Sequence, residues 1–188
     1  MRSPTNFIVR PKEGRRYDNI KKIGGIDFIT STSKEDHKSS NRFAEVVSTP
    51  ISYDGDIKPG DTIVVHHNVF KYYYDMKGRE KSGRSFLKDD LFLIDPYQYY
   101  LYNDGNGWKC DDRFCFVKPI PKQDFYLDIP GVYQPLFGEL KYINKKLLSF
   151  GLEQGDIVSF KPDSEYEFSI DEEKLYRVSS DWITMRWN

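Results

Sequence analysis

The sequence predicts an all-β protein, and its composition is the first observation that does so. The 188 residues include 14 Tyr, 13 Phe and 3 Trp, whereas alanine occurs only at Ala44. Sheets favour aromatic and β-branched residues, and helices favour alanine. The second observation is that short apolar runs alternate with turn residues, as in barrels and sandwiches. The third is that no segment repeats its apolar residues with a helical period.

A long polar loop follows the first predicted strand. That strand is expected at residues 6–10, where Pro11 ends it. Residues 12–42 are rich in Lys, Gly, Ser and Thr and contain one apolar island, residues 23–29. Such a stretch without a regular pattern is unusual inside a compact domain and is typical of functional or disordered segments. We therefore expect a long mobile loop at about residues 12–42.

Short strands and a strong break define the rest of the chain. Strands are expected at residues 43–47, 62–66, 69–74, 84–87 and 91–95, separated by turn signals such as Pro59-Gly60. The strongest break is at residues 103–107 (NDGNG), because Asn, Asp and Gly tolerate the positive φ angles of turns. The sequence therefore predicts two modules, residues 1–105 and residues 106–188.

The second module repeats the first in outline. Four segments match in the same order: residues 7–11 (FIVRP) with 115–119 (CFVKP), 44–46 (AEV) with 138–140 (GEL), 60–65 (GDTIVV) with 155–160 (GDIVSF), and 91–94 (LFLI) with 175–178 (LYRV). The separation between matched segments shortens twice along the chain. This pattern predicts two copies of one fold, the second with fewer residues in two loops.

These segments resemble the GroES co-chaperonin family. The resemblance rests on residues 9–11 (VRP), 24–28 (GGIDF), 44–47 (AEVV), 59–65 (PGDTIVV) and 88–94 (KDDLFLI). It covers residues 6–102, and a weaker copy covers residues 113–186. The chain departs from the family at Asp27, where the triplet is normally apolar, and at residues 48–56, where the family has a longer roof hairpin. The second copy has no Gly-Gly loop in its corresponding segment, residues 120–137.

The resemblance implies a fold, a partner and a docking site. The fold would be two tandem GroES-like partial β-barrels, the first with the mobile loop. The function would be that of a co-chaperonin, which caps a GroEL-like chaperonin ring and assists ATP-dependent protein folding as a homo-oligomeric ring, a heptamer in this family. The implied chaperonin-binding residues are Ile23, Gly24, Gly25, Ile26, Asp27, Phe28 and Ile29. The resemblance implies no catalytic residue, cofactor or metal.

Physical chemistry gives the loop a reversible binding role. Ordering each residue of a flexible segment costs about 1–2 kcal/mol, whereas burying an Ile or Phe contributes about 1.5–3 kcal/mol. The anchors Ile23, Ile26, Phe28 and Ile29 therefore barely offset the ordering of the loop. Binding becomes firm when several loops of a ring act together. The alternative is an island that packs onto its own barrel.

Other classes of function find little support. The net charge of −1 argues against nucleic-acid binding, which needs a basic excess. We find no Gly-rich phosphate loop and no nucleophile elbow. No apolar run reaches 18 residues, so no membrane span is expected, and the N-terminus lacks the apolar stretch of a secretory signal. The simplest location is the cytoplasm, or the host cytoplasm if the Lys-, Asn-, Tyr- and Ile-rich composition reflects a viral source.

Three groups of residues are expected to have structural rather than functional roles. His66 and His67 are expected on a strand with their rings on opposite faces, so they would not chelate one metal. Cys110 and Cys115 are expected to be reduced thiols, with a disulfide or half a metal site as the alternative. The tyrosines at residues 72–74 and 97–100 are expected to fill strand faces and subunit seams rather than to stack on a ligand.

Two rival functions remain open at this stage. One is a non-enzymatic viral structural or binding module that reuses the GroES-like fold, since fold does not fix function. The other is an enzyme, because GroES-like barrels also occur in alcohol dehydrogenases, but the chain has no G-x-G-x-x-G after a strand. A mobile, exposed loop at residues 12–42 would favour the co-chaperonin, and a packed loop would favour the binding module.

Overall fold

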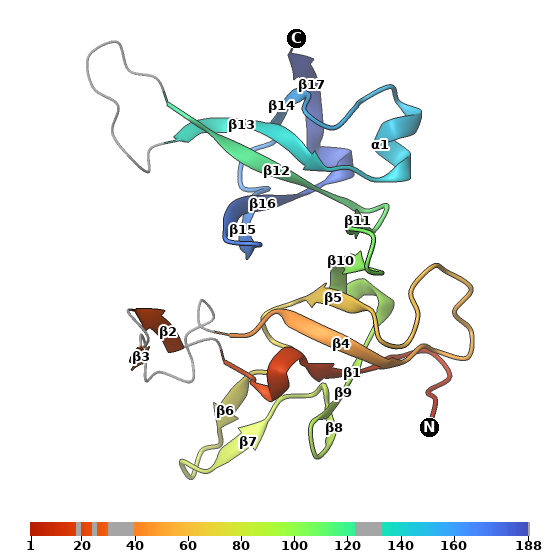
Figure 1. The fold of residues 1–188 in the computed structure, drawn as a ribbon, viewed down its shortest axis with the longest axis vertical. Helices are drawn as coiled ribbons and strands as arrows, with labels where there is room; N and C mark the ends of the chain where they lie inside the picture. Colours follow the sequence, from red (N-terminus) through yellow and green to blue (C-terminus); the bar gives the residue numbers. More distant parts are fainter. Residues whose placement is uncertain (18–19, 24–25, 30–39, 123–132, 188) are drawn as a thin grey trace. The chain divides into compact units, whose positions relative to one another are not determined.

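Strands dominate the computed structural model (Figure 1), which describes residues 1–17, 20–23, 26–29, 40–122 and 133–187. For residues 20–23 and 26–29 only the backbone is described. The chain divides into two compact units, Met1–Gly107 and Trp108–Asn188. The predicted boundary between residues 105 and 106 lies in the bend just before Trp108. The all-β class is confirmed. No helix in the described part of the chain is long and apolar enough to cross a membrane.

Unit 1 is built on one antiparallel sheet with two additional hairpins. Its strands run in the order β10-β5-β4-β1-β9-β8. Their bounds are β1 (Phe7–Pro11), β4 (Phe43–Ser48), β5 (Thr62–Val65), β8 (Phe86–Lys88), β9 (Leu91–Ile94) and β10 (Tyr99–Asn103). The hairpins pair β2 (Ile20–Ile23) with β3 (Ile26–Ile29), and β6 (Tyr72–Tyr74) with β7 (Glu80–Ser82). Two single-turn 3₁₀ helices are η1 (Lys12–Gly14) and η2 (Pro96–Gln98).

Unit 2 opens with the short β11 (Trp108–Cys110) and contains one antiparallel sheet with the strand order β15-β16-β12-β13-β14-β17. The bounds are β12 (Phe114–Pro121), β13 (Tyr133–Tyr142), β14 (Ile157–Phe160), β15 (Tyr166–Ile170), β16 (Glu173–Ser179) and β17 (Ile183–Trp187). A five-residue helix, α1 (Lys145–Ser149), and the 3₁₀ helix η3 (Ser180–Trp182) connect strands. The sequence analysis missed α1, which is too short to show a helical period.

Six strands of each unit follow the same order in its sheet. Replacing β8, β9, β1, β4, β5 and β10 by β15, β16, β12, β13, β14 and β17 converts one strand order into the other. The register also agrees: Ile8–Ser48 corresponds to Phe116–Tyr142, Val9–Val46 to Val117–Leu140, and Pro11–Ala44 to Pro119–Gly138. Both ladders have an irregularity at the same step, between Ile8 and Val9 and between Phe116 and Val117. The repeat read from the sequence is therefore a repeat of structure.

The Gly-Asp pairs explain why this repeat was visible in the sequence. Gly60 and Gly155 have φ angles of +97° and +93°, in the left-handed region that favours glycine. Asp61 and Asp156 each accept, through Oδ2, a 2.8 Å hydrogen bond from the backbone N–H three residues earlier. Each pair thus closes the turn that leads into the next strand, as predicted.

Each unit buries its own apolar core. In unit 1, Phe7, Phe70 and Phe92 are fully buried, and the rings of Phe70 and Phe92 meet edge to face at 4.8 Å. In unit 2 the core includes Val117 and Leu140 from the paired strands and Leu147 from α1. A core of its own gives each unit the means to hold its sheet together.

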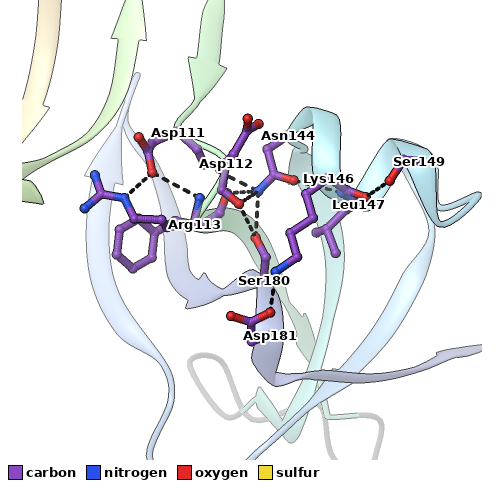
Figure 2. A network of polar contacts seen from close by, with 10 residues as sticks. Asp111, Asp112, Arg113, Asn144, Lys146, Leu147, Ser149, Ser180 and Asp181 are labelled. Carbon is purple, nitrogen blue, oxygen red and sulfur yellow. Dashed lines mark hydrogen bonds and ion pairs between the residues drawn. The ribbon is translucent and has the colours of Figure 1, made fainter. Parts of the chain in front are cut away.

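The buried side chain of Asn144 connects several elements of unit 2 (Figure 2). The Nδ2 of Asn144 lies 2.6 Å from the Phe114 carbonyl oxygen, 2.6 Å from Ser180 Oγ and 3.1 Å from the Asp112 carbonyl oxygen. Its Oδ1 accepts a 2.9 Å hydrogen bond from the Leu147 backbone N–H and so caps α1. One side chain thereby joins β12, α1 and η3.

Candidate functional site

The β2–β3 hairpin carries most of the predicted docking residues. Its register pairs Ile20 with Ile29 and Ile23 with Ile26. Of the seven predicted contact residues, the backbones of Ile23, Ile26, Asp27, Phe28 and Ile29 belong to these strands, whereas Gly24 and Gly25 lie outside the described residues. Within the part of the chain that the structure describes, the two strands form a two-stranded sheet of their own.

Regular strands at this position differ from the sequence prediction of an irregular loop. The apolar residues at both ends of each four-residue strand, and a Gly-Gly pair between the strands, are a recognised hairpin pattern. This pattern was obscured by the polar residues around it. Lys12 to Gly14 form η1, and Tyr17 pairs with Ser40, so regular structure extends into both ends of the predicted loop.

Four residues, Arg16, Tyr17, Ser40 and Asn41, join the two ends of this interval and form what we term the loop anchor. Tyr17 and Ser40 form an antiparallel bridge, and the Asn41 N–H donates to the Arg16 carbonyl oxygen at 2.9 Å. The Asn41 side chain also donates to the Arg15 carbonyl oxygen at 2.7 Å, and Ser40 Oγ donates to the His67 carbonyl oxygen at the same distance. Ser40 and Asn41 are buried. The anchor therefore holds both ends of the loop together on the body of unit 1.

Aromatic rings secure the first leg of the loop anchor. The Arg16 guanidinium lies over the rings of Tyr72 at 4.1 Å and Phe92 at 4.7 Å, and it donates to Ser82 Oγ at 2.9 Å. Tyr17 stacks on Tyr72 with an interplanar angle of 11°, and its hydroxyl accepts a 2.9 Å hydrogen bond from the Tyr72 N–H. Burial raises the pKa of Tyr17, so the hydroxyl stays protonated at neutral pH. Cation–π contacts and stacking thus hold Arg16 and Tyr17 in place on unit 1.

The loop anchor was missed by sequence reasoning, and no sequence signal marks it. Tyr17 and Tyr72 are 55 residues apart, and each residue type is ordinary on its own. Only the fold brings Arg16 between β6, β7 and β9. The predicted apolar island could be found from sequence because its members are adjacent in the chain.

The corresponding interval of unit 2 lies between β12 and β13. These strands pair as far as Pro121 and Tyr133, and residues 123–132 lie outside the described residues. The predicted absence of a second docking loop at residues 120–137 thus stays a prediction. Elsewhere in unit 2, a groove of about 410 Å³ is lined by residues in and near α1, η3 and β17, among them Leu147, Phe150 and Met185.

The prediction that His66 and His67 lie on a strand was wrong. Strand β5 ends at Val65, so His66 and His67 lie beyond it and are not forced to opposite faces. Their ring centroids are 4.1 Å apart. Across the described residues, no group of three or more His, Cys, Asp or Glu side chains is placed to hold a metal ion.

The cysteines and tyrosines fall into distinct environments. Cys110 and Cys115 are free thiols, and burial raises the pKa of Cys115 to about 12, so its thiol is protonated at neutral pH. Tyr99 and Tyr100 are buried, in line with a packing role, whereas Tyr73 and Tyr74 are exposed.

Comparison with known proteins identifies no relative: no protein-family model matches the chain, and no curated protein matches it. The functional argument therefore rests on the sequence and on the geometry of the β2–β3 hairpin and the loop anchor.

Proposed function

We propose that this protein is a co-chaperonin of the GroES type that caps a GroEL-like chaperonin ring through the β2–β3 hairpin. One observation carries the proposal: among the described residues, the strands β2 and β3, which contain members of the apolar island, pair with each other, while the loop anchor fixes both ends of their interval. A hairpin whose ends are held on unit 1 by the loop anchor suits a segment that binds a partner. It also limits the conformational freedom that docking would remove.

The strand geometry of β3 supports this role despite Asp27. Residues two apart in a strand belong to the same face, and neighbours belong to opposite faces. Ile26 and Phe28 therefore belong together as a docking pair, and Asp27 belongs to the opposite face. In an extended segment, the family's apolar triplet needs only its first and third members for one apolar face. The departure at Asp27 is compatible with the role for this reason.

We further propose that each unit is a GroES-like partial barrel. The support is the shared strand order and register of the two units, which matches the order of the family-like segments along the chain. Assembly into a ring, seven-fold as in the family, would present several hairpins at once. Each hairpin could then bind weakly and release readily, while the ring as a whole stays bound.

Binding to a purified GroEL-type ring, with and without ATP, tests the proposal. We expect wild type to be retained on the ring in ATP, and Ile26→Ser/Phe28→Ser to lose most of that retention. Ile51→Ser/Leu148→Ser is the matched control, because it also removes two apolar side chains, both exposed and outside the hairpin.

Each outcome of this experiment has a clear meaning. Equal retention of wild type and the hairpin variant would exclude the hairpin as the docking element. A wild type that the ring does not retain would favour the alternative, a non-enzymatic viral structural or binding module.

A further inference from the structure

Several hydrogen bonds close the turn at the tip of the β6–β7 hairpin. The Asp75 side chain accepts 2.9 Å hydrogen bonds from the backbone N–H groups of Lys77 and Arg79. The Gly78 N–H donates to the Asp75 carbonyl oxygen, and the Asp75 N–H donates to the Arg79 carbonyl oxygen, both at 2.9 Å. Gly78 has a φ angle of +70°, which glycine adopts without strain. The tip is therefore a defined structure.

Large apolar side chains at and next to this turn are exposed to solvent. Met76 at its apex is fully exposed, and Tyr73 and Tyr74 on β6 are 52% and 46% exposed. Neighbours in a strand belong to opposite faces, so Tyr73 and Tyr74 expose one ring on each face of the hairpin. Exposed large apolar side chains are candidate contacts, and methionine adapts readily to a partner's shape. Tyrosine supplies contact area with little conformational entropy to lose.

The hairpin is also basic within a nearly neutral chain. Residues 71–84 contain five basic residues (Lys71, Lys77, Arg79, Lys81 and Arg84) and two acidic ones (Asp75 and Glu80). The segment is therefore positively charged, whereas the whole chain has a net charge of −1. A partner surface that complements it is apolar and carries acidic side chains.

The loop anchor joins this hairpin to the docking hairpin. Arg16 lies over Tyr72 and donates to Ser82, so it contacts both β6 and β7. Tyr17 accepts a hydrogen bond from the Tyr72 N–H and lies three residues before β2. One set of contacts thus holds the bases of both hairpins, and a partner that engages one is brought to the other.

We propose that the β6–β7 tip is a second contact with the same chaperonin ring, at an apolar spot bordered by acidic side chains. This inference rests on the proposed function and deepens it by naming a second element that touches the partner. The two contacts would act as linked sites, so loss of the second weakens binding without abolishing it. The basic side chains would make binding salt-dependent.

The test measures the affinity for a purified GroEL-type ring in ADP by fluorescence anisotropy. Tyr73→Ser/Met76→Ser should bind about tenfold more weakly than wild type. Lys77→Glu/Arg79→Glu should also bind more weakly and should show a shallower dependence on salt. Met185→Ser/Leu148→Ser is the matched control in unit 2, and circular dichroism should show all variants folded. A photo-reactive residue at position 76 should crosslink to the ring.

The outcomes separate this inference from the proposed function. If the two tip variants bind like wild type while Ile26→Ser/Phe28→Ser does not bind, the second contact is refuted and the docking hairpin stands. Crosslinking from position 76 only to a second copy of the chain would also refute it. If wild type does not bind the ring, both proposals fall.

Discussion

At the scale of single residues, Asn144 is the clearest case of one side chain that organises its surroundings. It is buried and caps α1 through Oδ1, and its Nδ2 contacts oxygen atoms of four other residues (Figure 2). A buried acceptor that loses its donor is costly, because water cannot replace the bond. The stability of unit 2 should therefore depend on this amide.

Replacing Asn144 tests that dependence. Asn144→Ala should lower the free energy of unfolding by about 2 kcal/mol, because α1 loses its cap and backbone carbonyl groups lose their hydrogen-bond donor. Asn144→Asp keeps the cap acceptor but directs a carboxylate at the carbonyl oxygen of Phe114, so it should be at least as destabilising. Urea unfolding measures both. Asn103→Ala is the control, since the Asn103 side chain accepts a hydrogen bond within its own turn, from the Gly105 N–H. Tolerance of Asn144→Asp would contradict this account.

What the sequence reveals at this scale depends on distance along the chain. The turns at Gly60-Asp61 and Gly155-Asp156 were predicted because their hydrogen bonds are local. The roles of Asn144 and Arg16 were not, because their partners come from remote strands. The histidine error came from extending β5 past Val65, a boundary that apolar pattern alone does not locate.

At the scale of elements, Glu173 links three strands of unit 2. From β16, its carboxylate lies 2.6 Å from Lys118 Nζ on β12 and 2.8 Å from Lys141 Nζ on β13. Hydrogen bonds from Lys118 and Lys141 lower the pKa of Glu173. Its folded pKa is therefore below the unfolded value, which is about 4.3.

This shift predicts a pH dependence. The contribution of Glu173 is complete above the unfolded pKa and is lost as the pH falls through the lower folded pKa. Because the three side chains are partly exposed, the contribution should be below about 1 kcal/mol. Chemical unfolding at pH 7 and pH 3 should show that Glu173→Gln costs more stability at pH 7 than at pH 3. In a Lys118→Met/Lys141→Met background the same change should have no pH-dependent effect. An equal cost at both pH values would contradict the argument.

The hairpins show what element-level prediction lacked. The described residues of the apolar island belong to β2 and β3, and this organisation was not foreseen, because the polar context suggested an irregular loop. Helix α1 was missed because its five residues are too few to show an apolar helical period. Its capping residue, Asn144, is a start signal that a short helix can carry without any periodicity.

At the scale of the whole molecule, one fold is used twice with different loops. Unit 1 has the β2–β3 hairpin and the β6–β7 hairpin, and unit 2 has α1 and a shorter route from β14 to β16. The order of the six matched strands is the same in both units, and the β1–β4 and β12–β13 ladders share their register. The matched segments predicted this repeat because strand-entry turns constrain sequence. The partner could not be predicted from the core, because function lies in the loops.

Electron microscopy of a GroEL-type ring mixed with this protein and ATP tests the central claim most directly. The proposal predicts added density that closes an end of the ring for wild type. Bare rings are expected for Ile26→Ser/Phe28→Ser at the same concentration and with unchanged circular dichroism. Bare rings with folded wild-type protein, or equal capping by wild type and the hairpin variant, would contradict the proposal.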